Sequence, residues 1–232
     1  MKTDALAATH TPEVPRDFTS DFVAAVDRQL TQLGMRRPLQ AYRIWQRPIA
    51  PGVSEWVSLV PRFFGGGEGS LGVVVTVGAR HEAVEGALRT LWPELADSTA
   101  STTKIGASIA INVQELIPEP VRGAIYVDGP QFLEPAALTV AERVRDYGEP
   151  FARSVVPLPA LIDAWKIRGN PMATDYRLPI ALYLDGRPDE AKEALASTLE
   201  RLGTMSGPVR EHFEAFARDF FARMATLPVQ AE

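Results

Sequence analysis

The chain of 232 residues contains no cysteine. Disulfides, thiolate metal sites and cysteine nucleophiles are therefore excluded together. Histidine is also scarce, because the sequence holds only His10, His81 and His212. A zinc site built mainly from histidine is not expected, and we predict neither a metal ion nor a cofactor. The absence of cysteine suits a reducing compartment such as the cytoplasm.

The sequence also lacks a long apolar run. The longest apolar stretch lies around Leu71–Ala79, is far too short to cross a bilayer and is interrupted by Gly72 and Thr76. Residues 1–16 are too polar to form the core of a signal peptide. We therefore expect a cytoplasmic protein with no membrane partner, and a loose tail over residues 1–17.

No long block of one charge sign is present. The 24 lysines and arginines are outnumbered by 29 acidic residues, so the formal net charge is −5. A protein that neutralises many phosphates usually carries a basic surplus or patch, so we expect no nucleic-acid partner. Hydrophobic residues make up 46% of the chain, which is enough to build a substantial core.

The first half of the chain has the patterns of a sheet protein. A helix is predicted from Asp21, because apolar residues then recur at helical spacing until Gly34. Extended segments follow, with turn residues between the first three of them. They are Gln40–Arg47, Val53–Phe64, Leu71–Val77, Lys104–Leu116 and Ala124–Val127, with a helix at Glu82–Leu91. Residues 18–128 are thus predicted to form an antiparallel sheet of four to five strands flanked by helices.

The second half of the chain has helical periodicity. The two strongest segments are Pro188–Leu202 and Pro208–Leu227, each of which begins with proline and places apolar residues on one stripe. Earlier helices are predicted at Ala136–Tyr147, Pro159–Ile167 and Tyr176–Leu184. Residues 129–232 are therefore predicted to form a helical region packed on the sheet, and the expected fold class is α+β.

Three short motifs match known sites only in part. Gly67–Gly72 matches G-x-G-x-x-G, but a strand follows it where a dinucleotide site needs a helix, so we predict no nucleotide binding. Ser101–Lys104 matches S-x-x-K, but it lies in a polar linker and its companion motifs are absent. His81-Glu82 begins a helix, but position 85 is Glu85 where a zinc motif needs histidine.

Carboxylates near the ends of predicted elements remain candidate catalysts, although the sequence does not indicate which pair meets in a cleft. The alternative is that they have ordinary roles at the surface or as helix caps. The candidate carboxylates are Asp128, Asp146, Glu149, Asp163, Asp175 and Asp185.

Aromatic and basic residues on the predicted strands suggest a recognition surface. If Tyr42 and Ile44 face the core, alternation directs Arg43, Trp45 and Arg47 to the other face of the sheet. Tryptophan and arginine on a polar field are typical of binding surfaces. The candidate binding residues are Arg43, Trp45, Trp56, Arg62 and Asn112. Alternatively, the C-terminal helices cover this face and the tryptophans belong to the core.

Three segments resemble uncharacterised bacterial domains that have a helix, a turn and then an antiparallel sheet. They are Leu33-Gly34-Met35-Arg36-Arg37, Tyr42-Arg43-Ile44-Trp45 and Leu71-Gly72-Val73-Val74-Val75. The resemblance covers about 110 residues, and some relatives of such domains look like immunity or toxin-associated proteins. It implies an α+β fold without an assigned activity.

A second resemblance concerns Ile180–Ala191, which is similar to the inter-helix part of a tetratricopeptide hairpin. Small residues such as Ala181 and Ala191 allow two helices to approach closely. A single hairpin of this type does not form a repeat array, so the resemblance implies a helical hairpin and no particular partner.

Two functions of different classes follow from these observations. The first is a non-enzymatic protein that binds another protein, in keeping with an immunity-like role in a bacterial conflict system. The alternative is a small hydrolase or transferase with carboxylates in a cleft between sheet and helices. A deep pocket with converging acids favours the enzyme, whereas an open face without one favours binding.

Overall fold

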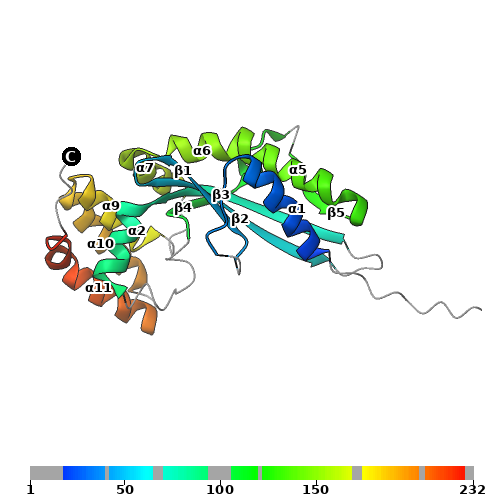
Figure 1. The fold of residues 1–232 in the computed structure, drawn as a ribbon. Helices are drawn as coiled ribbons and strands as arrows, with labels where there is room; N and C mark the ends of the chain where they lie inside the picture. Colours follow the sequence, from blue (N-terminus) through cyan, green and yellow to red (C-terminus); the bar gives the residue numbers. More distant parts are fainter. Residues whose placement is uncertain are drawn as a thin grey trace, which may run out of the picture.

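The structure is a computed structural model. It describes residues 18–39, 42–64, 70–93, 106–119, 122–168, 174–203 and 207–227. One sheet runs through the middle of the molecule, with helices along one of its faces and a second group of helices at one end (Figure 1). The predicted α+β class is confirmed: an antiparallel sheet forms in the first half of the chain, and helices dominate after it.

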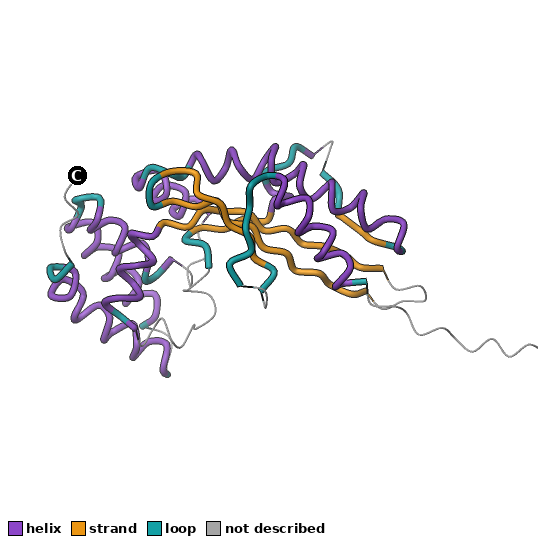
Figure 2. Tube along the Cα trace, in the orientation of Figure 1, coloured by secondary structure: helices purple, strands orange, loops and turns teal. Residues whose placement is uncertain are grey.

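The sheet has five strands, all in antiparallel pairs. The strands are β1 (Ile44–Ala50), β2 (Val53–Phe64), β3 (Ser70–His81), β4 (Ile109–Asn112) and β5 (Ile125–Val127). Their order is β1-β2-β3-β4, and β5 also pairs with β3. Because β4 pairs with residues 76–79 of β3 and β5 pairs with residues 71–73, the two short strands lie end to end beside it. Figure 2 shows this arrangement along the Cα trace.

One predicted strand is much shorter than its alternating sequence indicated. Among the described residues of Lys104–Leu116, only Ile109–Asn112 is extended, and a 3₁₀ turn, η1 (Val113–Glu115), follows at once. The Asn112 side chain causes this change, because its Oδ1 accepts a hydrogen bond of 3.0 Å from the backbone N–H of Gln114. Such a local side-chain bond competes with continuation of the strand.

Helices cover one face of the sheet. They are α1 (Thr19–Gln32), α5 (Leu133–Arg143) and α6 (Glu149–Ser154), with the π-turn η4 (Val144–Gly148) joining the last two (Figure 1). The short 3₁₀ turn η3 (Pro130–Phe132) leads into α5. A side chain at Gly148 would place its Cβ 2.9 Å from Val77 Cγ1, so glycine permits the close approach of this helix to β3. We call this side the covered face.

The second group of helices lies at one end of the sheet. It contains α2 (Glu82–Leu91), α7 (Leu158–Arg168), α9 (Arg177–Leu184), α10 (Pro188–Leu202) and α11 (Pro208–Met224). Its core includes Trp92, whose ring centroid lies 4.5 Å from that of Phe216. The apolar stripe of α11 packs into this core, because Phe213, Phe216 and Phe220 are at most 1% exposed.

Helices α9 and α10 form the predicted hairpin. Gly186 has a φ of 75° in the turn between them, a left-handed conformation that glycine adopts at little cost. Ala181 and Ala191 are both fully buried, which allows the two helices to pack closely. Among the described helices, none has both the length and the apolar character required to cross a bilayer.

Candidate protein-binding surface

The side of the sheet opposite α1, α5 and α6 carries no helix along most of its length within the described residues (Figures 1 and 2). We call this side the open face. Alternation along the paired strands assigns its side chains. They are Ile44, Gln46, Trp56, Ser58, Val60, Arg62, Val74, Thr76, Ala110, Asn112 and Tyr126.

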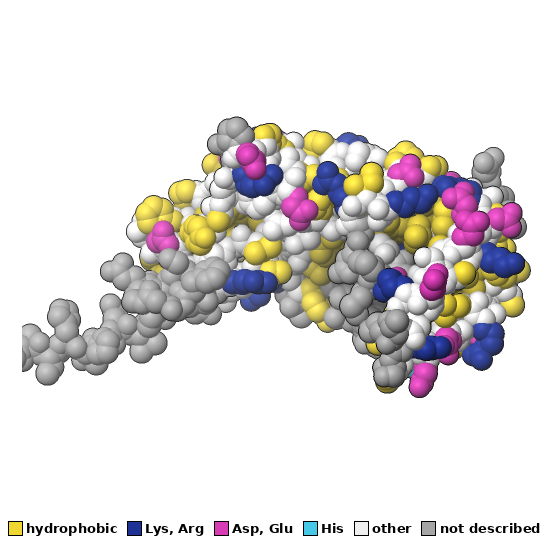
Figure 3. All heavy atoms as spheres, turned by 180° about the vertical axis from the view of Figure 1, so that it is seen from behind, with side chains coloured by type: hydrophobic (Ala, Val, Ile, Leu, Met, Phe, Trp, Pro, Cys, Tyr) yellow, Lys and Arg dark blue, Asp and Glu magenta, His cyan; other side chains and the backbone are white. Residues whose placement is uncertain are grey.

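Apolar side chains on the open face are accessible to solvent. Val60 on β2 is 44% exposed, and Tyr126 on β5 is 54% exposed. On the covered face, by contrast, Val57 and Val77 are fully buried. The space-filling view shows hydrophobic side chains among basic and acidic ones on the surface of the described residues (Figure 3). The exposure of Val60 and Tyr126 makes the open face an accessible surface.

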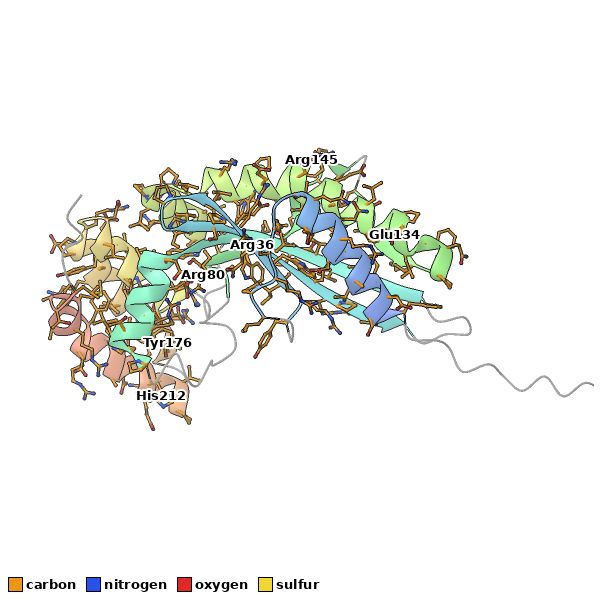
Figure 4. The ribbon with its side chains drawn as sticks, viewed as in Figure 1. Arg36, Arg80, Glu134, Arg145, Tyr176 and His212 are labelled. Atoms are coloured by element: carbon orange, nitrogen blue, oxygen red, sulfur yellow. The ribbon has the colours of Figure 1, made fainter. Side chains whose placement is uncertain are left out.

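The charge of the open face differs from that of the whole chain. None of its strand side chains is acidic, although the formal net charge of the protein is −5. Arg62 is an exposed cation on this face. Arg36 adds another, because it pairs with Gln46 in an isolated antiparallel bridge and paired residues share a face. Arg36 lies in the segment between α1 and β1, whereas Tyr176, just before α9, and His212, on α11, lie in the group of helices at the end of the sheet (Figure 4).

Three of the five predicted binding residues lie on the open face. Arg62 is exposed, and Asn112 is half-buried with its Oδ1 engaged by Gln114. Trp56 is only 8% exposed, and its partner on β3 is Gly78, which leaves space for the indole ring. Trp56 therefore contributes less accessible surface than its position in the sequence indicated.

The predicted orientation of the other two residues is wrong. Trp45 is fully buried in the core beneath α1, and its indole Nε1 donates a 2.6 Å hydrogen bond to Asp27 Oδ1. Arg43 has the same strand parity and lies at the edge of this covered side, next to α1. The error arises because alternation shows which residues share a face but does not show which face the helices cover. The alternative, in which helices cover this face and the tryptophans belong to the core, agrees better with Trp45, which shares one buried cluster with residues of α1 and α5.

A groove of about 720 Å³ opens between α1, the segment that leads into β1 and the middle of β2. Arg37 and Arg43 contribute its basic side chains, and Asp27 is its single acid. Its other lining residues are Ser20, Val23, Ala24, Tyr42, Ile44, Ser58 and Leu59. Because Ile44 and Ser58 also belong to the open face, the groove continues that surface beyond the edge of the sheet.

Three exposed arginines of the described residues lie in this region without an ionic partner among those residues. Most arginines of the described residues form ion pairs elsewhere, such as Arg47, Arg177 and Arg187. Within the described part of the chain, no side-chain ion pair involves Arg36, Arg43 or Arg62, and all three are exposed. This group of cations lies around the open face and the groove, where an acidic partner can reach it.

A buried polar cluster joins the sheet to the end helices, and the sequence did not indicate it. Glu85 is fully buried, and its two oxygens accept hydrogen bonds of 2.7 and 3.1 Å from Arg177. Ser108 Oγ donates to Glu85 Oε1 at 2.8 Å and accepts from the backbone N–H of His81 at 2.9 Å. Because Ser108 has no exposed face, this cluster serves packing rather than nucleophilic chemistry.

His81 belongs to the same cluster and is held as a neutral ring. Its Nε2 lies 2.8 Å from the carbonyl oxygen of Val155, so Nε2 carries the proton and donates. Burial lowers the pKa of His81 below its ordinary value, although the Val155 carbonyl and Glu85 oppose this effect. A neutral, buried histidine fits a structural role at the junction of β3 and α2.

A second buried carboxylate lies on the covered face and has only one partner. Glu55 Oε2 accepts a 2.6 Å hydrogen bond from Arg47 Nε, whereas Glu55 Oε1 is buried without a hydrogen-bond partner. Burial raises the pKa of Glu55, and the opposing effect of Arg47 does not cancel it. Arg47 also pairs with Glu149, whose pKa is lowered because hydrogen bonds from Arg153 and Arg47 outweigh its burial.

The carboxylates that were candidate catalysts do not converge in the described structure. Asp146 pairs with Arg145, Asp175 with Arg201, and Asp185 with Arg187. Glu149 is held by Arg47 and Arg153, and Asp163 lies exposed on α7. The acid of the 720 Å³ groove is Asp27, which the sequence analysis did not nominate.

The predicted motif segments add no site within the described residues. Residues 65–69 of the glycine-rich segment and all of 101–104 lie outside them. Within the described part of the chain, no three metal-binding side chains group together. Comparisons with protein-family models, with curated proteins and with solved structures find no significant match.

Proposed function

We propose that this protein binds another protein through the open face of its sheet. The observation that carries the proposal is the exposure of Val60 on β2 and of Tyr126 on the edge strand β5, both on the side of the sheet that carries no helix along most of its described length. A contiguous surface of this kind, with apolar side chains among neutral polar ones, is typical of interaction sites. The absence of acidic side chains from its strands supports a partner whose docking surface is apolar with acidic residues around it.

The resemblance of Leu33–Arg37 and of the following strand to uncharacterised bacterial domains, some of whose relatives look like immunity or toxin-associated proteins, motivates the finer form of the proposal. In that form, the partner is an acidic toxin or effector of a bacterial conflict system, and binding occurs in the cytoplasm. Immunity proteins act by occupying a surface of their partner, so they need a rigid docking face rather than a catalytic cleft. The helix-backed sheet supplies such a rigid face.

Site-specific photo-crosslinking tests the proposal. A benzophenone amino acid is placed in turn at Val60 and Tyr126 in the full-length chain, expressed in its native cells and irradiated. Leu138 on α5 is the matched control, because it is 48% exposed but lies away from the open face. We expect one discrete adduct from Val60 and Tyr126 that is absent from Leu138, and mass spectrometry identifies the partner.

The identified protein is then purified and titrated into the wild-type chain and into Tyr126→Arg. We expect saturable binding by the wild type and a loss of about a hundredfold in the variant, because a charge then replaces a desolvated aromatic contact. Absence of adducts from both positions, or a purified partner that does not bind, contradicts the proposal. An adduct of two copies of this chain also contradicts it.

A further inference from the structure

We propose that the groove beside α1 binds an extended acidic segment of the partner, with Arg43 as its carboxylate-binding anchor. This inference rests on the function proposed above and adds the chemistry of what is bound. The groove has a volume of about 720 Å³, within the range of sites that enclose small ligands or several peptide side chains. It joins the open face at Ile44 and Ser58, so a chain docked on the sheet can continue into it.

The charges in the groove favour an anionic occupant. Its acid, Asp27, accepts a hydrogen bond of 2.6 Å from the indole of Trp45 and is thereby engaged with the core. Two arginines, Arg37 and Arg43, line the groove together with this single acid. Guanidinium groups pair with carboxylates through charge-assisted hydrogen bonds, often with two parallel bonds. A cation is disfavoured in the same place because Arg37 and Arg43 repel it.

The two arginines have different roles. Arg37 is held in place, because its Nε donates to the carbonyl of Tyr42 at 2.7 Å and its guanidinium lies 5.5 Å from the Trp45 ring centroid. It therefore supplies a fixed positive field at little entropic cost. Arg43 is exposed and forms no side-chain ion pair within the described residues, so it can turn towards an incoming carboxylate.

The remaining walls of the groove suit a peptide better than a simple anion. Ala24 and the ring of Tyr42 provide exposed apolar surface, with the buried Val23 and Leu59 behind them, and Ser20 and Ser58 provide hydroxyl groups. A free phosphate makes no use of that apolar surface, whereas the side chains next to an acidic residue in a peptide do. The backbone N–H of Leu59 is already bonded to the carbonyl of Arg43, so recognition occurs through side chains rather than by strand addition.

The test uses defined peptides and the full-length chain. A library of acetylated, amidated heptapeptides contains one to three Asp or Glu residues among Leu, Tyr, Ser and Gly, and the strongest binders are titrated by fluorescence anisotropy. We expect Arg43→Gln to weaken their binding about tenfold, as for loss of one charge-assisted contact. Arg168→Gln is the control, because Arg168 is also exposed and without an ion pair among the described residues, but it lies on α7.

A comparison of acidic with neutral peptides tests whether Arg43 acts on the carboxylate of the peptide. Peptides with Asn or Gln in place of the acid should bind about tenfold more weakly to the wild type, and Arg43→Gln should weaken them little further. Inorganic phosphate should displace the peptide only weakly. Equal losses in Arg43→Gln and Arg168→Gln, or equal affinity for acidic and neutral peptides, overturn the inference. Phosphate that binds as well as the best peptide, with the same dependence on Arg43, also overturns it.

The two proposals fail in different ways. If the open-face crosslinks identify a partner whose affinity is unchanged in Arg43→Gln, the groove inference is wrong and the proposed function stands. If Val60 and Tyr126 give no adduct, the proposed function itself is wrong.

Discussion

The two faces of the sheet are built from the same strands but have opposite surroundings. On β2, Val57 points to the covered face and is fully buried, whereas Val60 points to the open face and is 44% exposed. The covered face also accepts Trp45 and the carboxylate of Glu55 into its interior. The comparison shows that β-branched residues build both faces, so hydrophobic sequence alone does not distinguish a core from a docking surface.

The largest expected effect is at Trp45 on the covered face. Trp45→Ala removes a fully buried indole and its hydrogen bond to Asp27. The free energy of unfolding should fall by about 3–5 kcal/mol, from lost burial and the cavity that remains. Urea denaturation followed by circular dichroism measures it. A loss below about 1 kcal/mol would show that this tryptophan does not support the core.

The valines of β2 give the most direct comparison between the faces. Val57→Ala should cost about 2–3 kcal/mol, because a buried side chain loses its contacts and leaves a cavity. Val60→Ala should cost less than about 1 kcal/mol, mainly through the lower strand preference of alanine. That preference affects both variants, so the difference between them isolates burial. Equal losses in urea denaturation would contradict the assignment of an open face.

Glu55 on the covered face should make the free energy of unfolding depend on pH, which offers a further test of burial on that face. Because burial raises its pKa in the fold, its stabilising contribution is complete below the ordinary value of 4.5 and is lost as pH rises through the raised value. Glutamine does not titrate. The unfolding free energy of Glu55→Gln minus that of the wild type should therefore increase as pH rises from about 4 to 7, measured by urea denaturation at each pH.

Glu149 provides the control for this pH dependence. Its pKa is lowered, so its contribution is present above 4.5 and is lost as pH falls through the depressed value. The difference between Glu149→Gln and the wild type should run in the opposite direction. The same slope for both variants would contradict the assignment for Glu55.

The smallest expected effect on stability is at Arg62 on the open face. Arg62 is exposed and has no ion pair among the described residues, so Arg62→Gln should change the unfolding free energy by less than about 0.5 kcal/mol. Affinity for the acidic partner should nevertheless fall, measured by calorimetry once crosslinking has identified it. A large loss of stability would indicate that Arg62 supports the fold rather than binding.

Local patterns predicted the elements of the fold, and the observed helix α10 has the bounds that its proline and apolar spacing indicated. The pattern of Lys104–Leu116 was overridden by one side chain, since Asn112 turns the backbone at Gln114. A two-residue period also could not decide which side of β1 the helix α1 covers, and Trp45 was therefore misassigned.

The long-range polar contacts had no signal in the sequence. Glu85 was considered only as a residue that breaks a zinc motif, yet it pairs with Arg177, which lies 92 residues away. The groove is likewise formed by segments that meet only after folding, and Asp27 has no distinctive neighbours in the sequence. Candidate carboxylates at the ends of elements instead pair with nearby arginines such as Arg145 and Arg187.

The order of the covering helices along the chain has a consequence for synthesis. Strands β1, β2 and β3 leave the ribosome before residues 133–154, which form α5, the π-turn and α6 over their apolar side. Of the described helices that cover this side, α1 alone precedes them in the chain, so the nascent sheet exposes apolar surface of the kind that chaperones bind until they emerge. A transcript that stops before Ser154 would therefore yield an aggregation-prone fragment rather than a smaller working protein.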